Sequence, residues 1–431
     1  MKPTIELSMI VKNGAAALRR CLASVAPFVD RIIIGDTGSS DESKSIACDF
    51  SAEVINLPWE QDFARARNRV LEHRKCDWIL VLDADEMLDS SGAATIRALL
   101  DAPEVFAYHN WRWNYLRDTS TRIGYQAARP NPILIEESRP YPAYVALPTT
   151  RLFRNHPGIF YEGCVHETVT RRLAALQLAT ARAGFVVHHF GHAEDAPEER
   201  NQKDALYQLL AAKKLKANPN DPQAWMEQGQ AELEQAHRPA VALACFERVC
   251  QLSAGSAAGW LYAGMCLVRL NRCTEALQRL ERAAALGLRN AVFYQAVGDA
   301  YFHAGSYTQA HEAYSQLARL GEASPLSEAK LGACEVHLGR ASDGIRHMQQ
   351  ALGSAPAFIE LYDILATGAL LAGDLALAAQ TTETRIRMGN STQFHVQLAA
   401  LIEAQIRART EPASGTVSAA PATTVPESSM N

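Results

Sequence analysis

Residues 76–86 read C-D-W-I-L-V-L-D-A-D-E, and this segment sets the class of the fold. Its apolar run, residues 78–82, is typical of a strand buried on both faces of a parallel sheet. Three carboxylates, Asp83, Asp85 and Glu86, follow this run directly. Strand side chains repeat every two residues, so Asp83 and Asp85 share a face, about 7 Å apart. Two such oxygen donors can share a divalent cation with a diphosphate. The alternative is a solvated acidic turn, since the D-x-D pattern is common by chance.

The flanking sequence alternates strands with helices. Strands are predicted at Glu6–Val11, Arg31–Gly35 and Ala52–Leu57, and helices at Ser43–Phe50 and Phe63–His73. This alternation predicts an α/β domain with a mostly parallel sheet covered on both faces. In such sheets ligands bind beyond the carboxyl ends of the strands, where Asp36 and Asp83 are both expected.

Two further segments could meet a polar ligand. D-T-G-S-S-D at residues 36–41 follows a strand, and Gly38 permits a tight turn, although Ser40 or Asp41 could simply cap the next helix. In D-F-A-R-A-R-N, residues 62–68, Asp62 is a plausible helix cap, and the arginines could pair with a diphosphate or be ordinary surface charges.

From about residue 200, strands give way to Ala- and Leu-rich helices with a period of 34 residues. Three registers keep this step: Ala242, Ala276, Ala310, Gly344 and Ala378; His237, Asn271, Gly305, Gly339 and Gly373; and Gly264, Gly298 and Gly332. The pattern resembles the tetratricopeptide repeat, whose helix pairs need small residues where they cross. The first repeat matches least, with Trp225 and Gly229 one residue out of phase. After residue 410 a Ser-, Thr-, Pro- and Ala-rich tail is predicted to be disordered.

Composition excludes several classes of function. The chain has 431 residues, with 42 Lys plus Arg against 47 Asp plus Glu, and this near balance argues against a nucleic-acid binder. No apolar run approaches the roughly 20 residues of a membrane span, and the N-terminus lacks a secretory signal pattern. Nine scattered cysteines without a C-x-x-C pair favour free thiols. We therefore expect a soluble, cytoplasmic protein of two or three domains.

The ordered set of motifs resembles the family 2 glycosyltransferases, which have the GT-A fold. The matching segments are S-M-I-V-K-N at 8–13, D-T-G-S-S-D at 36–41, D-F-A-R-A-R-N at 62–68, W-I-L-V-L-D-A-D-E at 78–86, R-L-F-R at 151–154, Y-E-G-C-V-H-E at 161–167 and H-F-G-H at 189–192. The most similar subgroup joins this domain to tetratricopeptide repeats and includes cysteine S-glycosyltransferases that modify bacteriocin peptides. The predicted domains are a GT-A catalytic domain at 1–198, a repeat domain at 199–410 and the tail at 411–431.

The resemblance implies a donor site for a nucleotide sugar, usually linked to UDP. Asp85 would bind Mg²⁺ or Mn²⁺ directly, with Asp83 contacting both ribose and metal. Asp36 would recognise the uracil–ribose end. A late histidine often completes such a metal site, and His189 fits, although the subgroup usually has tyrosine where this chain has His192. His188 and His192 stay open as alternatives, and any of the three could be an ordinary buried histidine. The other implied donor-site residues are Ile10, Val11, Asn13, Asp62, Arg67 and Asn68.

An inverting transferase also needs a general base for the acceptor. Glu167 and His166 in V-H-E are the candidates, ahead of Glu86, although a Glu could instead pair with a nearby arginine such as Arg171 or Arg172. A thiol acceptor needs a strong base less, because cysteine already deprotonates near pH 8.5. The aromatic stretch of Trp111, Trp113, Tyr115 and Tyr125 could form an acceptor groove or tie the sheet to a flap.

Two hypotheses from different classes follow. The first is a metal-dependent inverting glycosyltransferase whose repeats bind a peptide or protein acceptor, or another copy of the chain. The second is a non-catalytic scaffold with a degenerate GT-A domain. The intact acids at 36, 83 and 85 favour the enzyme. The pattern leaves open which sugar is moved, and whether the acceptor is a peptide Cys, Ser or Thr, a protein or a glycan.

Overall fold

The computed structural model describes residues 2–117, 122–123, 126–164, 167–234, 236–389 and 391–410. Tyr125, His166 and the predicted disordered tail at 411–431 lie outside these residues. The main chain forms two compact units. The first comprises Met1–Arg117 with Asn131–His237, and the second Asp118–Pro130 with Arg238–Asn431.

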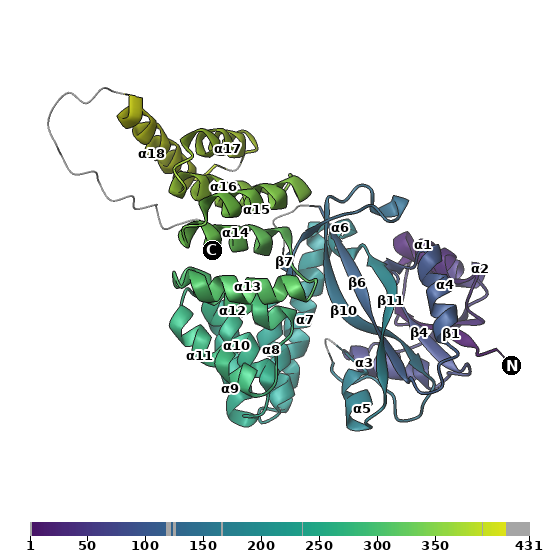
Figure 1. Ribbon diagram of the computed structural model, residues 1–431. Helices are drawn as coiled ribbons and strands as arrows, with labels where there is room; N and C mark the ends of the chain where they lie inside the picture. The colour runs from purple at the N-terminus through teal and green to yellow at the C-terminus, as the bar shows by residue number, and fades with distance from the viewer. Residues whose placement is uncertain are drawn as a thin grey trace. The chain divides into compact units, whose positions relative to one another are not determined.

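The first unit is built on a mixed sheet with the strand order β3-β2-β1-β4-β10-β6-β11-β5. Figure 1 labels five of these strands, β1, β4, β6, β10 and β11. The strands along this order are β1 (Ile5–Val11), β2 (Arg31–Asp36), β3 (Glu53–Asn56), β4 (Trp78–Val81), β5 (Glu86–Met87), β6 (Ala107–Leu116), β10 (Ala143–Arg154) and β11 (Thr180–His189). The first four run parallel, as predicted. Beyond them β10 runs antiparallel to both β4 and β6, so only half of the sheet has the purely parallel order.

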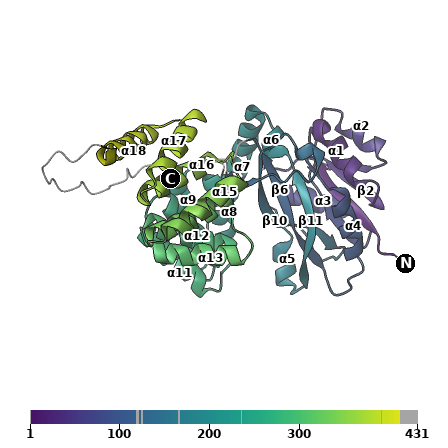
Figure 2. The same cartoon turned by 45° about the horizontal axis from the view of Figure 1, so that its top comes forward.

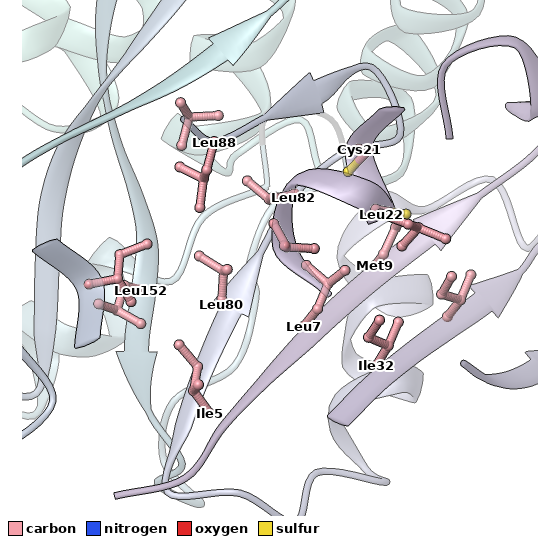
Figure 3. Packing of buried hydrophobic residues seen from close by; sticks show 14 of the residues in the cluster. Ile5, Leu7, Met9, Cys21, Leu22, Ile32, Leu80, Leu82, Leu88 and Leu152 are labelled. Carbon is pink, nitrogen blue, oxygen red and sulfur yellow. The ribbon is translucent and has the colours of Figure 1, made fainter. Parts of the chain in front are cut away.

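Helices cover both faces of this sheet. The helices of the first unit are α1 (Ala15–Val25), α2 (Ser43–Asp49), α3 (Phe63–Leu71), α4 (Ser90–Leu99), α5 (Thr170–Ala175), α6 (Gly191–Glu194), α7 (Pro197–Ala217) and α8 (Pro222–Glu234), with a short 3₁₀ turn at Glu136–Ser138. On one face α1, α2 and α4 pack on β1 and β4, where Leu7 and Leu80 are fully buried (Figure 3). On the other, α3 and α5 pack on Ile79 and Val81.

The parallel strands bring their carboxyl ends to one edge of the sheet. Val11 of β1 is in register with Asp36 of β2, and Ser8 of β1 with Val81 of β4. A Cβ at Gly14, after β1, would lie 3.1 Å from Cβ of Ala84, after β4. The loops that follow these strands therefore meet, and they carry the predicted site residues.

The second unit is a solenoid of paired helices. They are α9 (Pro239–Leu252), α10 (Ala257–Arg269), α11 (Cys273–Ala285), α12 (Ala291–His303), α13 (Tyr307–Arg319), α14 (Pro325–His337), α15 (Ala341–Ser354), α16 (Ile359–Leu371), α17 (Leu375–Arg387) and α18 (Gln393–Thr410). The starts of α10, α12, α14 and α16 are 34 residues apart, as are those of α11, α13, α15 and α17, which confirms the period. Consecutive helices pack side by side along the stack (Figure 2). Three short strands, β7 (Arg122–Ile123), β8 (Gln126–Ala127) and β9 (Arg129–Pro130), lie in the segment that belongs to this unit.

The repeated small residues act as predicted. A Cβ at Gly298 would lie 2.6 Å from the ring of Tyr314, and one at Gly332 would lie 2.7 Å from the carbonyl oxygen of Gly344. The loop register at His237, Asn271, Gly305, Gly339 and Gly373 has positive φ throughout, between 51° and 81°. That left-handed conformation ends a helix, and Gly and Asn adopt it with least strain.

The first repeat departs from this regularity. α8 begins 35 residues before α10, which accounts for the one-residue offset of Trp225 and Gly229. Helices α7 and α8 belong to the first compact unit, whereas the sequence motifs place the domain boundary near residue 198. That boundary stays a prediction. In the part of the chain that the structure describes, no helix combines the length and the apolar character that a bilayer span requires.

Candidate functional site

The turn after β4 is held by hydrogen bonds with the backbone and side chain of Glu86 and with Cys21. Glu86, which is fully buried, accepts the Asp83 amide on Oε2 at 3.0 Å, and its own amide donates to the Asp83 carbonyl at 3.0 Å. The thiol of Cys21 donates to the same carbonyl at 3.4 Å. Glu86 therefore shapes the turn, and its burial makes it a poor candidate for a general base.

Both carboxylate oxygens of Asp83 are held by arginines. Arg67 donates through Nη2 to Oδ1 at 2.6 Å, and Arg151 donates through Nη2 to Oδ2 at 2.7 Å. Burial would raise the pKa of Asp83, but the charges of Arg151 and Arg67 outweigh it and hold the pKa well below its usual value. Each oxygen of Asp83 is thus already paired with a guanidinium group, and its metal role stays a prediction.

Asp85 points elsewhere, to His189. Oδ2 of Asp85 lies 3.4 Å from Nε2 of His189, and the Asp85 carbonyl accepts the amide of Phe190 at 3.1 Å. Burial raises the pKa of Asp85, but the neighbouring His189 outweighs it and brings the pKa to about 2. A Cβ at Gly191 would lie 2.3 Å from Oδ2 of Asp85 and 3.0 Å from Nε2 of His189. Only glycine at position 191 leaves room for the side chains of Asp85 and His189.

The neighbouring histidines differ from His189. His188 is fully buried, its Nδ1 lies 2.7 Å from the hydroxyl of Tyr115, and burial lowers its pKa to about 4. It is a neutral core residue. The side chain of His192 lies outside the described part of the structure. Of the histidines whose side chains are described here, His189 is the one that faces Asp85.

Asp85 and His189 suit a divalent cation whose coordination is completed by ligands from outside this pair. Adjacent ligands of an octahedral Mg²⁺ ion lie about 3.0 Å apart, close to the 3.4 Å between Asp85 and His189. The described residues contain no group of three or more His, Cys, Asp or Glu suited to hold a metal. Two protein ligands with phosphate oxygens and water is a common arrangement for Mg²⁺.

The predicted nucleotide-binding loops are tied to each other. Asn13, at φ 52°, accepts the Ser40 amide on Oδ1 at 2.8 Å, and its own amide donates to Ser39 Oγ at 2.9 Å. Asp36 is buried and accepts the amide of Gly38 at 3.1 Å, with Lys44 Nζ also 3.1 Å away. Burial would raise its pKa, but bonds to Ser39 and Lys44 lower it. Ile10 and Val11 lead into this loop at the end of β1.

On α3, the predicted donor-site residues make structural bonds. Asp62 caps the helix by accepting the Arg65 amide at 2.9 Å, as predicted. Asn68 donates to the carbonyl of Tyr161 at 2.9 Å and accepts its amide at 2.8 Å. Asp62, Asn68 and Tyr161 also line a hollow of about 890 Å³ beside α3, which neither Asp83 nor Asp85 lines. Their donor-binding role stays a prediction.

Arg67 links Glu167, the candidate general base, to Asp83 in the turn after β4. Its Nε donates to Glu167 Oε1 at 2.7 Å, while its Nη2 holds Asp83. The partner of Glu167 is therefore Arg67, from α3, and not the sequence neighbours Arg171 or Arg172. The second candidate base, His166, lies outside the described residues.

The fold brings three residues near the Asp83 turn to which the sequence motifs assigned no role, Arg151, Tyr161 and Tyr207. Arg151 stood in the matching R-L-F-R segment, and Tyr161 opened Y-E-G-C-V-H-E. Tyr161 is buried beside Arg67 and Arg151, and burial raises the pKa of its phenol to about 12. Tyr207 of α7 stacks edge-on to Phe63 at 5.8 Å. Burial and the charges of Glu167, Asp83 and Asp85 raise its pKa.

The aromatic stretch in β6 packs largely within the sheet. Tyr115 is fully buried and stacks on Phe190 at 5.1 Å, and Trp113 stacks on Tyr144 at 4.1 Å. These contacts favour the structural interpretation for Tyr115.

Comparisons with known proteins agree with the geometry. Residues 7–157 match the family model described as Glycosyl transferase family 2. A TPR repeat-containing protein of Synechococcus elongatus is 35% identical over 212 residues, which cover 48% of this chain and 47% of that protein. The SPbeta prophage-derived glycosyltransferase SunS of Bacillus subtilis (strain 168) is 25% identical over 228 residues, covering 52% and 48%. The match thus spans about half the length of each of these curated relatives.

Among solved structures, a chain in the crystal structure of the APC/C hetero-tetramer Cut9-Hcn1 aligns with a TM-score of 0.41 and 15% identity. The alignment covers 47% of this chain and 40% of that one. A likeness this low carries no argument about function.

Proposed function

We propose that this chain, whose residues 7–157 carry a family 2 glycosyltransferase domain, is a metal-dependent inverting glycosyltransferase. It would move a sugar from a nucleotide donor, UDP-linked, to a peptide or protein acceptor. The relative SunS is named a glycosyltransferase, and the other relative a repeat-containing protein. These two names correspond to the two parts of the proposed architecture.

The observation that carries the proposal is the Asp85–His189 pair. The two side chains meet at the sheet edge where β1, β2 and β4 end, and Gly191 leaves the space that they need. This edge is where ligands bind in open α/β sheets. Asp85 and His189 lie so close together that no side chain fits at position 191, and such an arrangement suits a cation site better than a solvated acidic turn.

The other residues divide the remaining work. The loops around Asn13 and Asp36 would bind the base and ribose, and Asp85 with His189 would hold Mg²⁺ or Mn²⁺. When bound, that cation would neutralise the charge that develops on the leaving diphosphate. Glu167, oriented by Arg67, would accept the acceptor proton.

The solenoid would present the peptide or protein acceptor, because stacked repeats offer extended surfaces. Assembly with a second copy is an alternative use of the same surface. A reducing, cytoplasmic location stays a prediction. All nine cysteines, each within the described residues, are free thiols, which fits it.

The test is thermal unfolding with UDP in the presence and absence of Mn²⁺. At a concentration of one hundred times Kd, bound nucleotide would stabilise the chain by about 2.7 kcal/mol, and EDTA would remove the effect. Asp85→Asn should abolish the Mn²⁺-dependent shift. The control is Asp343→Asn, an exposed solenoid residue paired with Arg346. The same measurement is repeated with Mg²⁺. If the wild-type protein shows no response to UDP with Mn²⁺ or with Mg²⁺, or if Asp85→Asn responds fully, the proposal is wrong.

A further inference from the structure

A β-bulge in β10 presents one arginine to the site. Thr150 is in register with His109 of β6, and Leu152 is in register with Tyr108, the residue before His109. Arg151, between Thr150 and Leu152, therefore has no paired residue in β6. Bulges insert one unpaired residue and change the direction of its side chain, and they occur often beside active sites. Leu152 pairs with Leu80 of β4, which places Arg151 next to the end of that strand, where Asp83 follows.

The bulge is stabilised by a buried amide side chain. The Arg151 amide, which the strand ladder leaves unpaired, donates to Oδ1 of Asn110 at 3.2 Å. Asn110 is 2% exposed and Arg151 is 8% exposed. A buried backbone amide without a partner would be costly, so Asn110 makes the irregular backbone tolerable at this position. The local sequence thus supports the bulge instead of a regular strand.

From the bulge, Arg151 reaches two carboxylates of the same turn. Its Nη2 donates to Oδ2 of Asp83 at 2.7 Å and also contacts Oε1 of Glu86. Glu86 in turn accepts the Asp83 amide at 3.0 Å. Arg151 therefore fixes both the side chain and the backbone of the Asp83–Glu86 turn.

Arg67 holds the opposite oxygen of Asp83 from the other side. The two guanidinium groups leave Asp83 no freedom to turn toward the Asp85–His189 pair. Removing one partner of a buried ion pair leaves an uncompensated charge, which the turn would relieve by moving. The position of Asp85, two residues along the chain, depends on that turn.

We propose that Arg151, presented by the bulge and supported by Asn110, is a positioning residue that holds the Asp83–Glu86 turn in the conformation that binds a nucleotide diphosphate with its cation. The inference rests on the proposed function, and it assigns to Arg151 no contact with the substrate. It differs from a general contribution to stability because it predicts a loss of ligand affinity in a chain that remains folded.

The experiment compares Arg151→Met with Arg154→Met in the full chain. Arg154 lies on the same strand, stacks on Trp78 at 4.5 Å and donates to the carbonyls of Val105 and Ala102, without contacting a carboxylate of the turn. Calorimetry would measure UDP binding at saturating Mn²⁺, below the unfolding temperature of each variant. We expect Arg151→Met to weaken binding by about ten- to a hundredfold, the usual range for residues that orient a metal ligand. Arg154→Met should stay within about twofold.

Two further variants sharpen the result. Asn110→Ala, which removes the support of the bulge, should weaken UDP binding in the same direction but less. Arg151→Lys, which keeps the charge, should recover part of the affinity. If Arg151→Met binds UDP and Mn²⁺ like the wild type, or if Arg154→Met loses as much, Arg151 has only a structural role. If the wild type itself does not bind, the proposed function fails first, so the two failures are distinguishable. If Arg151→Met does not fold, Asn110→Ala and Arg151→Lys decide between the outcomes.

Discussion

Gly191→Ala tests the metal site with the smallest possible change. The added Cβ would lie 2.3 Å from Oδ2 of Asp85, whereas ordinary contacts begin at 3.4 Å, so the carboxylate must move by about 1 Å. It cannot move without changing its approach to His189, which is 3.4 Å away. A displacement of about 1 Å in a reacting group costs roughly a hundredfold in rate. We therefore expect turnover about a hundredfold lower, with Mn²⁺ bound more weakly.

The variant should remain folded, so that its loss of activity can be measured separately from any loss of stability. Gly191 begins α6, where alanine is at least as favourable as glycine, and any cost of overpacking is about 1–3 kcal/mol. The assay is Mn²⁺ binding in the presence of UDP, followed by electron paramagnetic resonance, with hydrolysis of nucleotide sugars measured in parallel. The matched control is Gly184→Ala in β11, where a Cβ would have no atom within 4 Å. If Gly191→Ala binds Mn²⁺ and UDP as tightly as Gly184→Ala, Asp85 and His189 do not form the cation site.

Two predictions concern the solenoid. Asp299 is buried; burial would raise its pKa, but Lys330 at 2.7 Å lowers it to about 2. Its carboxylate should contribute stability above the unfolded pKa of about 3.9, and this should be lost as the pH falls from about 4 toward 2. Asp299→Asn should lower the unfolding free energy at pH 7 by about 3–5 kcal/mol by leaving Lys330 unpaired; urea unfolding would measure this, and no acid loss in the wild type would contradict it. Gly298→Ala should cost about 1–3 kcal/mol against the Tyr314 ring, whereas Gly353→Ala, in open space on α15, should be neutral or stabilising. Thermal unfolding would compare them, and equal midpoints would show that the solenoid can accommodate the extra methyl group.

Local patterns predicted most of the architecture, because each depends on residues close in the chain. The alternation around Trp78 predicted the parallel half of the sheet, whose strand bounds agree with the structure to within a residue or so. The step of 34 residues predicted the paired helices, whereas the left-handed conformation of the positions that share this step was seen only in the structure. Asp62 was predicted as a helix cap and is one. The antiparallel half was less visible, because pairing between β10, β4 and β6 joins segments far apart in sequence.

The candidate site was predictable in its members but not in their partners. Residue order placed Asp83 and Asp85 together after one strand. The prediction that both lie on one face of an extended strand does not hold, because residues 83–86 form a turn in which the Glu86 amide donates to the Asp83 carbonyl. The fold separates their roles, since Asp83 is held by Arg67 and Arg151 while Asp85 meets His189. No spacing rule could have paired Arg151 with Asp83, because they are brought together by a register shift in β10.

The amino-acid sequence alone therefore established the two kinds of structure, the edge of the sheet that carries the acids and the family likeness. These follow from periodicities and strand ends, which are properties of short segments. Tertiary structure alone decided which charges neutralise one another, which histidine faces Asp85 and why position 191 lacks a side chain. Such matters depend on ångström-scale distances between residues as far apart as 16 and 104 positions, as with Arg67 to Asp83 and Asp85 to His189. The packing of the whole sheet sets these distances.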